Sequence, residues 1–353
     1  MKILILDENN LYSSYFISLL KDTIEIDIVT RCEIKNNKKN VRILIGNRRE
    51  GNVGRELQKK YNVIIDTDCL VVEDIDRIFE FVIAEKYILF STAQVYRYVG
   101  GKIFCEDDIN YEYINRINGE YIDFEKEKLK FYIREKINIE QRLKNICTQK
   151  SITYNILRLS KCYSEKDIYK DIRWINYMLR HYNGVLVTCN NLKTIGEYSV
   201  VYVEDIIKII EKILLDDNLQ NEIFNIAQDE ILSFFKVTSI LSMIRNKNLS
   251  YEIIYVPDIC ENIIKVPCGE QLLISNNHLT NKYNIKFTKT EKWVEKIYKM
   301  QQKKNICIEE KEKLMILEFV KYKKNLQNIL ETEKNNLLKE KNEGKIIKLY
   351  ENL

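Results

Sequence analysis

Residues 87–97 have the sequence YILFSTAQVYR, an apolar run that ends in small polar residues. Tyr87–Phe90 has the composition of a buried strand, and Ser91 and Thr92 follow it directly. A parallel strand has this pattern when its carboxyl end opens into a ligand crevice. Ser and Thr are also common where any strand stops, so two interpretations of the polar end remain.

A second stretch favours the ligand-facing interpretation. Tyr132 and Lys136 are four residues apart, so they share one face of the helix that we predict over residues 130–147. This spacing alone is weak evidence, because Tyr98 and Lys102 have it too. The order of the two stretches and the distance between them carry the argument.

Together the two stretches resemble the extended short-chain dehydrogenase/reductase family of NAD(P)-dependent epimerases, dehydratases and reductases. In that family a Ser-Ser/Thr-x-x-Val-Tyr strand signature precedes a Tyr-x-x-x-Lys helix. The resemblance implies that Tyr132 is the general acid/base, that Lys136 favours its phenolate and holds the ribose, and that Thr92 orients the substrate hydroxyl.

Predicted strands and helices alternate along the chain, which is typical of an α/β protein with a doubly wound parallel sheet. We predict strands at residues 2–6, 24–29, 41–45, 61–66, 86–91 and 152–158. We predict helices at residues 11–20, 51–60, 72–85 and 130–147. The resemblance implies a Rossmann-type core over 1–160 and a smaller, interleaved substrate lobe over 161–302. Residues 303–353 depart from the resemblance, and their pattern predicts a helical extension.

The turn after the first strand is where the family keeps Gly-x-x-Gly-x-x-Gly. Asp7, Asn10 and Ser13 stand at the three glycine positions, and the resemblance implies cofactor contacts from these residues, Leu11 and Lys136. Asn10 tolerates a left-handed backbone, and Ser13 is small enough for helix packing.

Asp7 and the adjoining Glu8 depart most from the family pattern. A carboxylate about 4 Å from a phosphate costs roughly 4 kcal/mol at an effective dielectric near 20. If the two acids take the free N–H groups of the turn, they replace the phosphate from within the chain. If they turn outward, dinucleotide binding can persist. A plain turn that holds nothing is the third alternative.

Two further residues concern the choice of cofactor. Arg31 ends the second predicted strand and suits a 2′-phosphate, although Glu33 lies close by. Asn47 follows the third strand, where the resemblance implies contact with the adenine. The expected cofactor is therefore NAD(P), with NADP favoured and binding weak or lost.

The second half of the chain continues the resemblance with less distinctive segments. Arg158 and Tyr163 match an Arg-Pro-x-x-x-Tyr-Gly pattern in which the Pro and Gly are replaced, and Asp205 is expected to cap a helix. The spacing of apolar positions in residues 308–338 predicts an amphipathic helix. It either packs on the body or mediates homodimerisation or partner binding. Its apolar positions are Met315, Phe319, Tyr322, Leu326, Ile329 and Leu330.

Composition limits the function classes. The 353 residues carry a net charge of only +4, which disfavours nucleic acid as a partner. No apolar run predicts a membrane span, and nine single cysteines with two histidines predict no metal site and a cytoplasmic location. Three hypotheses remain: an NAD(P)-dependent epimerase or reductase acting on a sugar-like or small alcohol/carbonyl substrate, a binding protein with a decayed cofactor site, and an RNA-binding protein like the family's chloroplast relatives.

Overall fold

The structure of the chain is a computed structural model. It describes residues 1–97, 103–109, 124–165, 172, 175, 185–189, 196–216, 221–245, 252–256, 272–304 and nine separate positions between 314 and 335. The chain forms two compact units. The first comprises Met1–Ile168, Glu197–Ser233 and Glu270–Trp293, and the second comprises Tyr169–Gly196, Phe234–Gly269 and Val294–Leu353.

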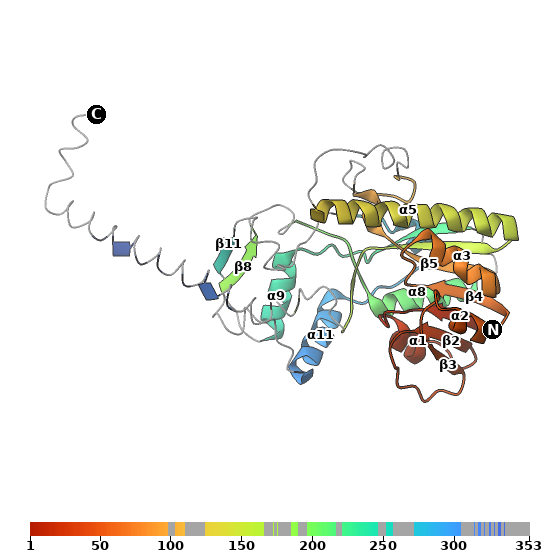
Figure 1. The fold of residues 1–353 in the computed structure, drawn as a ribbon. Coiled ribbons are helices and arrows are strands. Elements are labelled where there is room, and N and C mark those ends of the chain that lie inside the picture. The colour runs from red at the N-terminus through yellow and green to blue at the C-terminus, as the bar shows by residue number, and fades with distance from the viewer. Residues whose placement is uncertain are drawn as a thin grey trace. The chain divides into compact units, whose positions relative to one another are not determined.

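A seven-stranded sheet organises the first unit (Figure 1). Its order is β10-β6-β5-β4-β1-β2-β3, and every neighbouring pair is parallel. The strands are β1 (Lys2–Leu6), β2 (Glu25–Thr30), β3 (Val41–Ile45), β4 (Lys60–Asp66), β5 (Ile83–Thr92), β6 (Thr153–Leu159) and β10 (Glu222–Ile226). The strand order reverses between β1 and β4, which is the switch point where ligands bind in doubly wound sheets.

The predicted doubly wound parallel sheet is confirmed, with differences at two places. The prediction of a helix over 72–85 is wrong for its last three residues, because β5 begins at Ile83. Glu85 and Lys86 interrupt the apolar run there and resemble a helix surface in sequence. The seventh strand, β10, pairs with β6 and brings Asn225 beside Arg158.

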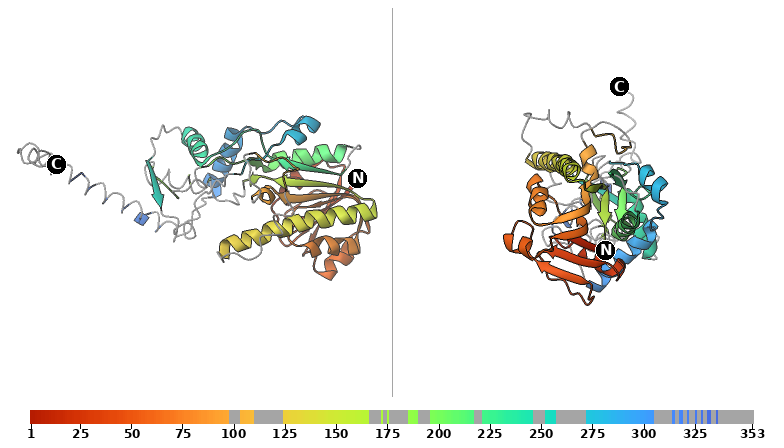
Figure 2. Two further views of the ribbon diagram at one scale, coloured as in Figure 1. Left: turned by 90° about the horizontal axis from the view of Figure 1, so that it is seen from above. Right: turned by 90° about the vertical axis from the view of Figure 1, so that its right-hand side faces the viewer.

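Helices cover both faces of the sheet. Figure 2 shows α8 (Val203–Leu215, green) and α5 (Phe124–Lys150, yellow) on opposite sides of the strands. α1 (Ser13–Leu19) packs beside α8, whereas α3 (Val72–Phe81) packs beside α5 and α2 (Gly51–Glu56). α1 and α2 are shorter than predicted, and α5 is longer.

The prediction that Asp205 caps a helix is wrong. α8 begins two residues earlier, at Val203, so Asp205 lies inside the first turn. Its buried carboxylate instead accepts hydrogen bonds from the Thr288 backbone N–H at 2.8 Å and from Lys208 Nζ at 2.7 Å. Asp205 therefore joins the helix to a segment distant in sequence.

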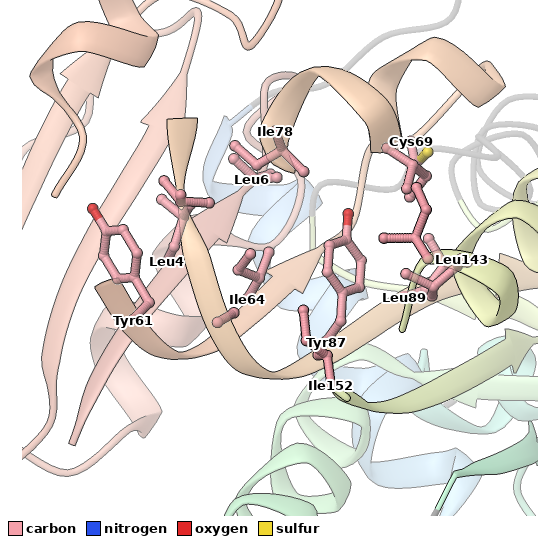
Figure 3. Close-up of a cluster of buried hydrophobic side chains, with 14 of the residues drawn as sticks. Leu4, Leu6, Tyr61, Ile64, Cys69, Ile78, Tyr87, Leu89, Leu143 and Ile152 are labelled. Carbon is pink, nitrogen blue, oxygen red and sulfur yellow. The ribbon is translucent and has the colours of Figure 1, made fainter. Parts of the chain in front are cut away.

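A hydrophobic core lies between the sheet and the α3–α5 layer (Figure 3). Leu4, Ile64 and Leu89 extend from three neighbouring strands and are fully buried. Ile78 of α3 and Leu143 of α5 pack against them. These strands are buried on both faces, which explains their nearly continuous apolar sequences.

Smaller elements complete the two units. In the first unit, β7 (Lys161–Tyr163) pairs with β9 (Val200–Tyr202), and α10 (Asn277–Tyr283) packs on β10. The second unit contains the parallel pair β8 (Val185–Cys189) and β11 (Glu252–Val256), and α9 (Phe234–Ile244). α11 spans Thr290–Lys304.

The predicted C-terminal helix is described at nine positions between 314 and 335, all of them helical and exposed. The apolar positions of the predicted stripe lie outside the described residues. Packing on the body, dimerisation and partner binding therefore all stay predictions, as do the bounds of the three predicted domains. Within the described part of the chain, no helix has the length and apolar character needed to cross a membrane.

Candidate functional site

The turn between β1 and α1 is closed by the carboxylate of Asp7. This side chain is fully buried and accepts hydrogen bonds from the backbone N–H groups of Leu11, Tyr12 and Ser13, at 3.0, 2.9 and 2.5 Å. The hydroxyls of Ser13 and Thr67 donate to it as well, at 2.5 and 3.1 Å. The N–H groups expected to face a phosphate thus have an acceptor within the chain.

The backbone of the turn contains one left-handed residue. Asn10, at the second glycine position, has φ of 53° and so adopts the left-handed conformation that the sequence analysis allowed. Its N–H donates to the Asp7 carbonyl at 2.9 Å. The neighbouring Asn9 donates to both carboxylate oxygens of Asp68, through its backbone N–H at 2.7 Å and its side chain at 2.8 Å.

Glu8 turns inward as well, towards two arginines. One of its oxygens lies 2.9 Å from Arg31 Nη2, and the other lies 2.8 Å from Arg48 Nε. Arg31 was expected to face a 2′-phosphate, and it forms an ion pair with Glu8 instead. Glu8 is only 5% exposed and Arg48 is buried, so their ion pair is shielded from water, whereas the Arg31 side chain is half exposed.

Arg48 extends the ionic network under the carboxyl edge of the sheet. It pairs bidentately with Asp66, the last residue of β4, at 2.5 and 2.8 Å. Burial opposes the charged form, but Asp66 outweighs it and raises the pKa of Arg48 well above its ordinary value. Tyr87 donates to the same carboxylate at 2.5 Å.

Asn47 makes its contacts within its own turn. Its side-chain Nδ2 donates to Glu50, and its Oδ1 accepts the Arg49 backbone N–H at 2.9 Å. Both polar groups of the amide therefore serve the segment after β3. The expected contact with adenine stays a prediction.

The catalytic residues implied by the resemblance lie on β5 and α5. Lys136 is 5% exposed and donates from Nζ to the carbonyls of Cys69 and Phe90, at 2.8 and 3.3 Å. Tyr132, 37% exposed, is on the same helix face, with its ring centre 5.8 Å from Lys136 Nζ. Thr92 Oγ1 accepts the Gln94 backbone N–H at 3.2 Å.

The convergence of the two hydroxyls stays a prediction. No hydrogen bond joins Thr92 and Tyr132 in the part of the chain that the structure describes. The alternative pair, Tyr98 and Lys102, lies outside the described residues. The structure thus brings Tyr132 and Lys136 together and leaves their relation to Thr92 open.

A buried polar network at the same edge was missed by sequence reasoning. Ser91 Oγ donates to Glu140, which pairs with Arg158 at 2.8 Å. Arg158 Nη1 donates to the Tyr96 hydroxyl at 2.7 Å, and Tyr96 donates to Asn225 at 2.7 Å. The sequence does contain a signal for this network. Arg158 lies in the apolar strand sequence SITYNILRL, and a buried charged side chain requires a buried partner.

Arg158 also fixes a segment that precedes α5. Its Nη1 lies 2.6 Å from the carbonyl oxygen of Glu106, whose carboxylate accepts the Asn225 backbone N–H at 2.8 Å. Burial disfavours the guanidinium cation, yet Glu140 dominates and raises the pKa of Arg158 above its ordinary value. The network remains charged and joins β5, β6, β10 and α5.

The residues of the turn do not fit a dinucleotide as they stand. Its pyrophosphate would need the N–H groups that Asp7 holds, and a ribose phosphate would need the arginine that Glu8 holds. Among the described residues, no group of three or more His, Cys, Asp or Glu side chains could hold a metal ion. The chemistry available at this edge comes from hydroxyls and buried charges.

The sequence matches no protein-family model and no curated protein. The strand order and the turn after β1 define a Rossmann-type fold. Solved structures of UDP-sugar 4-epimerases have the same fold, so the predicted fold is confirmed.

Three solved structures illustrate the similarity. The UDP-glucuronic acid 4-epimerase from Bacillus cereus, with UDP-glucuronic acid and NAD, is 15% identical, with TM-score 0.63 and coverage of 86% of this chain and 99% of that chain. The UDP-glucose 4-epimerase from Thermotoga maritima, with UDP-glucose, is 14% identical, with TM-score 0.64 and coverage of 87% and 100%. MoeE5, with UDP-glucuronic acid and NAD, is 12% identical, with TM-score 0.64 and coverage of 86% and 100%.

Proposed function

We propose that this chain is a binding protein on the epimerase fold, which takes a small sugar-like ligand without a nicotinamide dinucleotide. The observation that carries the proposal is the Asp7 carboxylate, which accepts three consecutive backbone N–H groups of the β1–α1 turn. A dinucleotide would have to break these hydrogen bonds before it could make its own.

The energetic cost of displacing the Asp7 carboxylate supports the proposal that the chain does not bind NAD or NADP. Hydrogen bonds to a charged acceptor contribute about 1.5–3 kcal/mol each, and a phosphate beside a retained carboxylate meets a repulsion of roughly 4 kcal/mol. Either effect weakens binding by about a hundredfold to a thousandfold. Thr67 and Ser13 hydroxyls hold the carboxylate further in place.

The residues at the end of β5 and on the facing side of α5 support the ligand class. Tyr132 exposes part of its ring beside the buried ammonium of Lys136, and Thr92 is half-buried at the end of β5. Aromatic and hydroxyl groups together suit a polar, ring-shaped ligand such as a sugar. Similar structures were solved with UDP-glucuronic acid and UDP-glucose, which makes a UDP-sugar the first ligand to test.

Calorimetric titration of the full chain tests the proposal. UDP-glucose and UDP-glucuronic acid should each be titrated alone and in the presence of NAD or NADP. We expect a UDP-sugar to bind with an affinity that the dinucleotides leave unchanged, and we expect no heat from the dinucleotides themselves. Micromolar binding of NAD or NADP by the native chain would refute the proposal.

An NAD(P)-dependent epimerase or reductase is the second candidate. The placement of Lys136 favours it, because the buried ammonium lies beside the ring of Tyr132, as the resemblance implies for a general acid/base. This candidate requires Asp7 to leave the turn when cofactor arrives. Epimerisation of a UDP-sugar, followed by NMR and abolished by Tyr132→Phe, would establish it in place of the binding protein.

A further inference from the structure

We infer that Asp7 and Glu8 stand in for two different phosphate groups of NADP, so that Asp7 excludes both NAD and NADP, and Glu8 adds a second obstacle for NADP alone. Asp7 occupies the place of the pyrophosphate, and Glu8 occupies the place of the 2′-phosphate. The inference rests on the proposed function and adds how the site is closed and which dinucleotide an opened site would select.

The hydrogen bonds of Asp7 are those that a phosphate would receive. Its carboxylate collects three backbone N–H donors and two hydroxyl donors, all within 3.1 Å. A carboxylate and a phosphate both accept only, so the same donors serve either group. Asp7 is attached to the end of β1, at the first glycine position, and needs no rearrangement of the turn to reach them.

Glu8 holds the cationic groups at the other place. Arg31 follows β2, where an arginine accommodates the 2′-phosphate of NADP in Rossmann folds. Its Nη2 donates to Glu8 Oε2 at 2.9 Å, and the other Glu8 oxygen accepts from Arg48. A 2′-phosphate would therefore face both an engaged arginine and a carboxylate of its own sign.

The two carboxylates act on different partners although they are adjacent in sequence. Asp7 bonds to the start of α1 and to Thr67, whereas Glu8 bonds to Arg31 and Arg48. Removal of one should therefore leave the contacts of the other intact.

Four proteins test the inference: the native chain, Asp7→Gly, Glu8→Gln and the double variant. Glutamine keeps an acceptor for the buried Arg48, so Glu8→Gln removes the charge without leaving that guanidinium unpaired. Each protein is titrated with NAD and with NADP by calorimetry. Asp22→Asn is the matched control, because it removes a charge from an exposed side chain that pairs only with Lys38 among the described ion pairs.

The four proteins should give a distinctive pattern. Asp7→Gly should gain affinity for NAD by at least about tenfold and should bind NADP more weakly than NAD, because Glu8 still faces the 2′-phosphate. The double variant should prefer NADP over NAD by about tenfold or more, because Arg31 is then released. Glu8→Gln alone and Asp22→Asn should bind neither dinucleotide, as we expect for the native chain.

Thermal unfolding supplies a readout that is independent of any activity. About 1 mM NAD should raise the Tm of Asp7→Gly and leave the native Tm unchanged. If Asp7→Gly does not fold, Asp7→Asn replaces it. The amide oxygen of asparagine keeps one acceptor for the turn without the negative charge. The same differences in dinucleotide affinity are then expected, but they should be smaller.

The outcomes separate this inference from the proposed function. A folded Asp7→Gly or Asp7→Asn that binds no dinucleotide refutes the inference and leaves the dinucleotide-free binding protein standing. A double variant that binds both dinucleotides equally refutes the role of Glu8. Micromolar binding by the native chain refutes both the inference and the proposed function.

Discussion

At the scale of single residues, buried carboxylates of this chain differ in the donors that hold them. Asp74 accepts the backbone N–H of Leu70 at 2.9 Å and pairs with Arg49 at 2.8 Å. Burial opposes its charged form, but Arg49 and the backbone donors outweigh burial and lower the pKa of Asp74. Asp74 thus fixes the start of α3 through its charge.

The lowered pKa of Asp74 predicts an acid-sensitive contribution to stability. A carboxyl group whose pKa is lowered in the folded state contributes its full stabilisation to the fold above its unfolded-state pKa of about 3.9. That contribution is lost as the pH falls through the lower folded-state pKa. Asp74→Asn should lower the free energy of unfolding by about 1–3 kcal/mol at pH 7, and by less near pH 2. Urea unfolding at several pH values measures this.

The control for Asp74 lies on the same helix. Asp76 pairs with Arg142 at 2.7 Å, but its side chain is 40% exposed. Asp76→Asn should change the stability by at most about 1 kcal/mol at either pH. Equal effects of the two substitutions would show that burial of Asp74 does not govern its contribution.

At the scale of elements, glycines in α2 report on the packing of helices against each other. A Cβ added to Gly54 would lie 2.6 Å from ring atoms of Phe81 in α3, whereas one added to Gly51 would meet nothing within 4 Å. The close approach of α2 and α3 therefore requires a glycine at position 54 but not at position 51.

Alanine substitutions separate packing from helix propensity. Gly54→Ala should lower the free energy of unfolding by about 1–3 kcal/mol, because the Phe81 ring must shift. Gly51→Ala, in the same helix, should be neutral or stabilising by up to about 1 kcal/mol. Thermal unfolding of both variants measures the difference. A stabilising Gly54→Ala would mean that Phe81 has free space beside it.

Elements were predictable from the sequence wherever burial was continuous. Lys2–Leu6 and Val41–Ile45 match their strands to the residue, because both runs end at polar or turn-forming residues. Ile83–Glu85 was assigned to the wrong element, since an amphiphilic strand start resembles a helix end. β10 is only five residues long, and its place beside β6 depends on pairing that local patterns do not encode.

The candidate site was predictable only in part. The sequence identified Asp7 and Glu8 as departures from the glycine-rich pattern, but not which donors each would take. The choice of donors depends on where each side chain points in the folded chain. Glu8, for example, contacts Arg31 and Arg48, which are distant from it in sequence. Similarly, Glu140 and Arg158 meet only after the sheet and α5 are assembled.

At the scale of the whole molecule, the Glu140–Arg158 pair joins distant parts of the first unit. Both side chains are fully buried, and their network reaches Ser91, Tyr96 and Asn225. A buried pair of this kind contributes little net stability as a unit, but a single unpaired charge in its place is costly. The pair therefore makes β5, β6, β10 and α5 depend on each other.

Arg158→Met should lower the free energy of unfolding by about 3–5 kcal/mol, because Glu140 is left buried and unpaired. The double variant Glu140→Gln/Arg158→Met should be more stable than Arg158→Met. Arg142 is also on α5 and forms an exposed ion pair with Asp76 of α3. Arg142→Met should therefore lower the free energy of unfolding by at most about 1 kcal/mol. Urea unfolding provides the values, and equal losses for Arg158→Met and Arg142→Met would contradict the prediction.

The strand order has a consequence for synthesis on the ribosome. β1 is made first and lies inside the sheet; β2 and β3 extend it on one side, and β4, β5, β6 and β10 extend it on the other. Every strand that emerges later can thus add to an edge that already exists, and none must insert between formed neighbours. The edge of β6 stays open until Glu222–Ile226 has left the ribosome. A nascent chain stalled before that point carries an unpaired parallel edge, the feature most prone to aggregation.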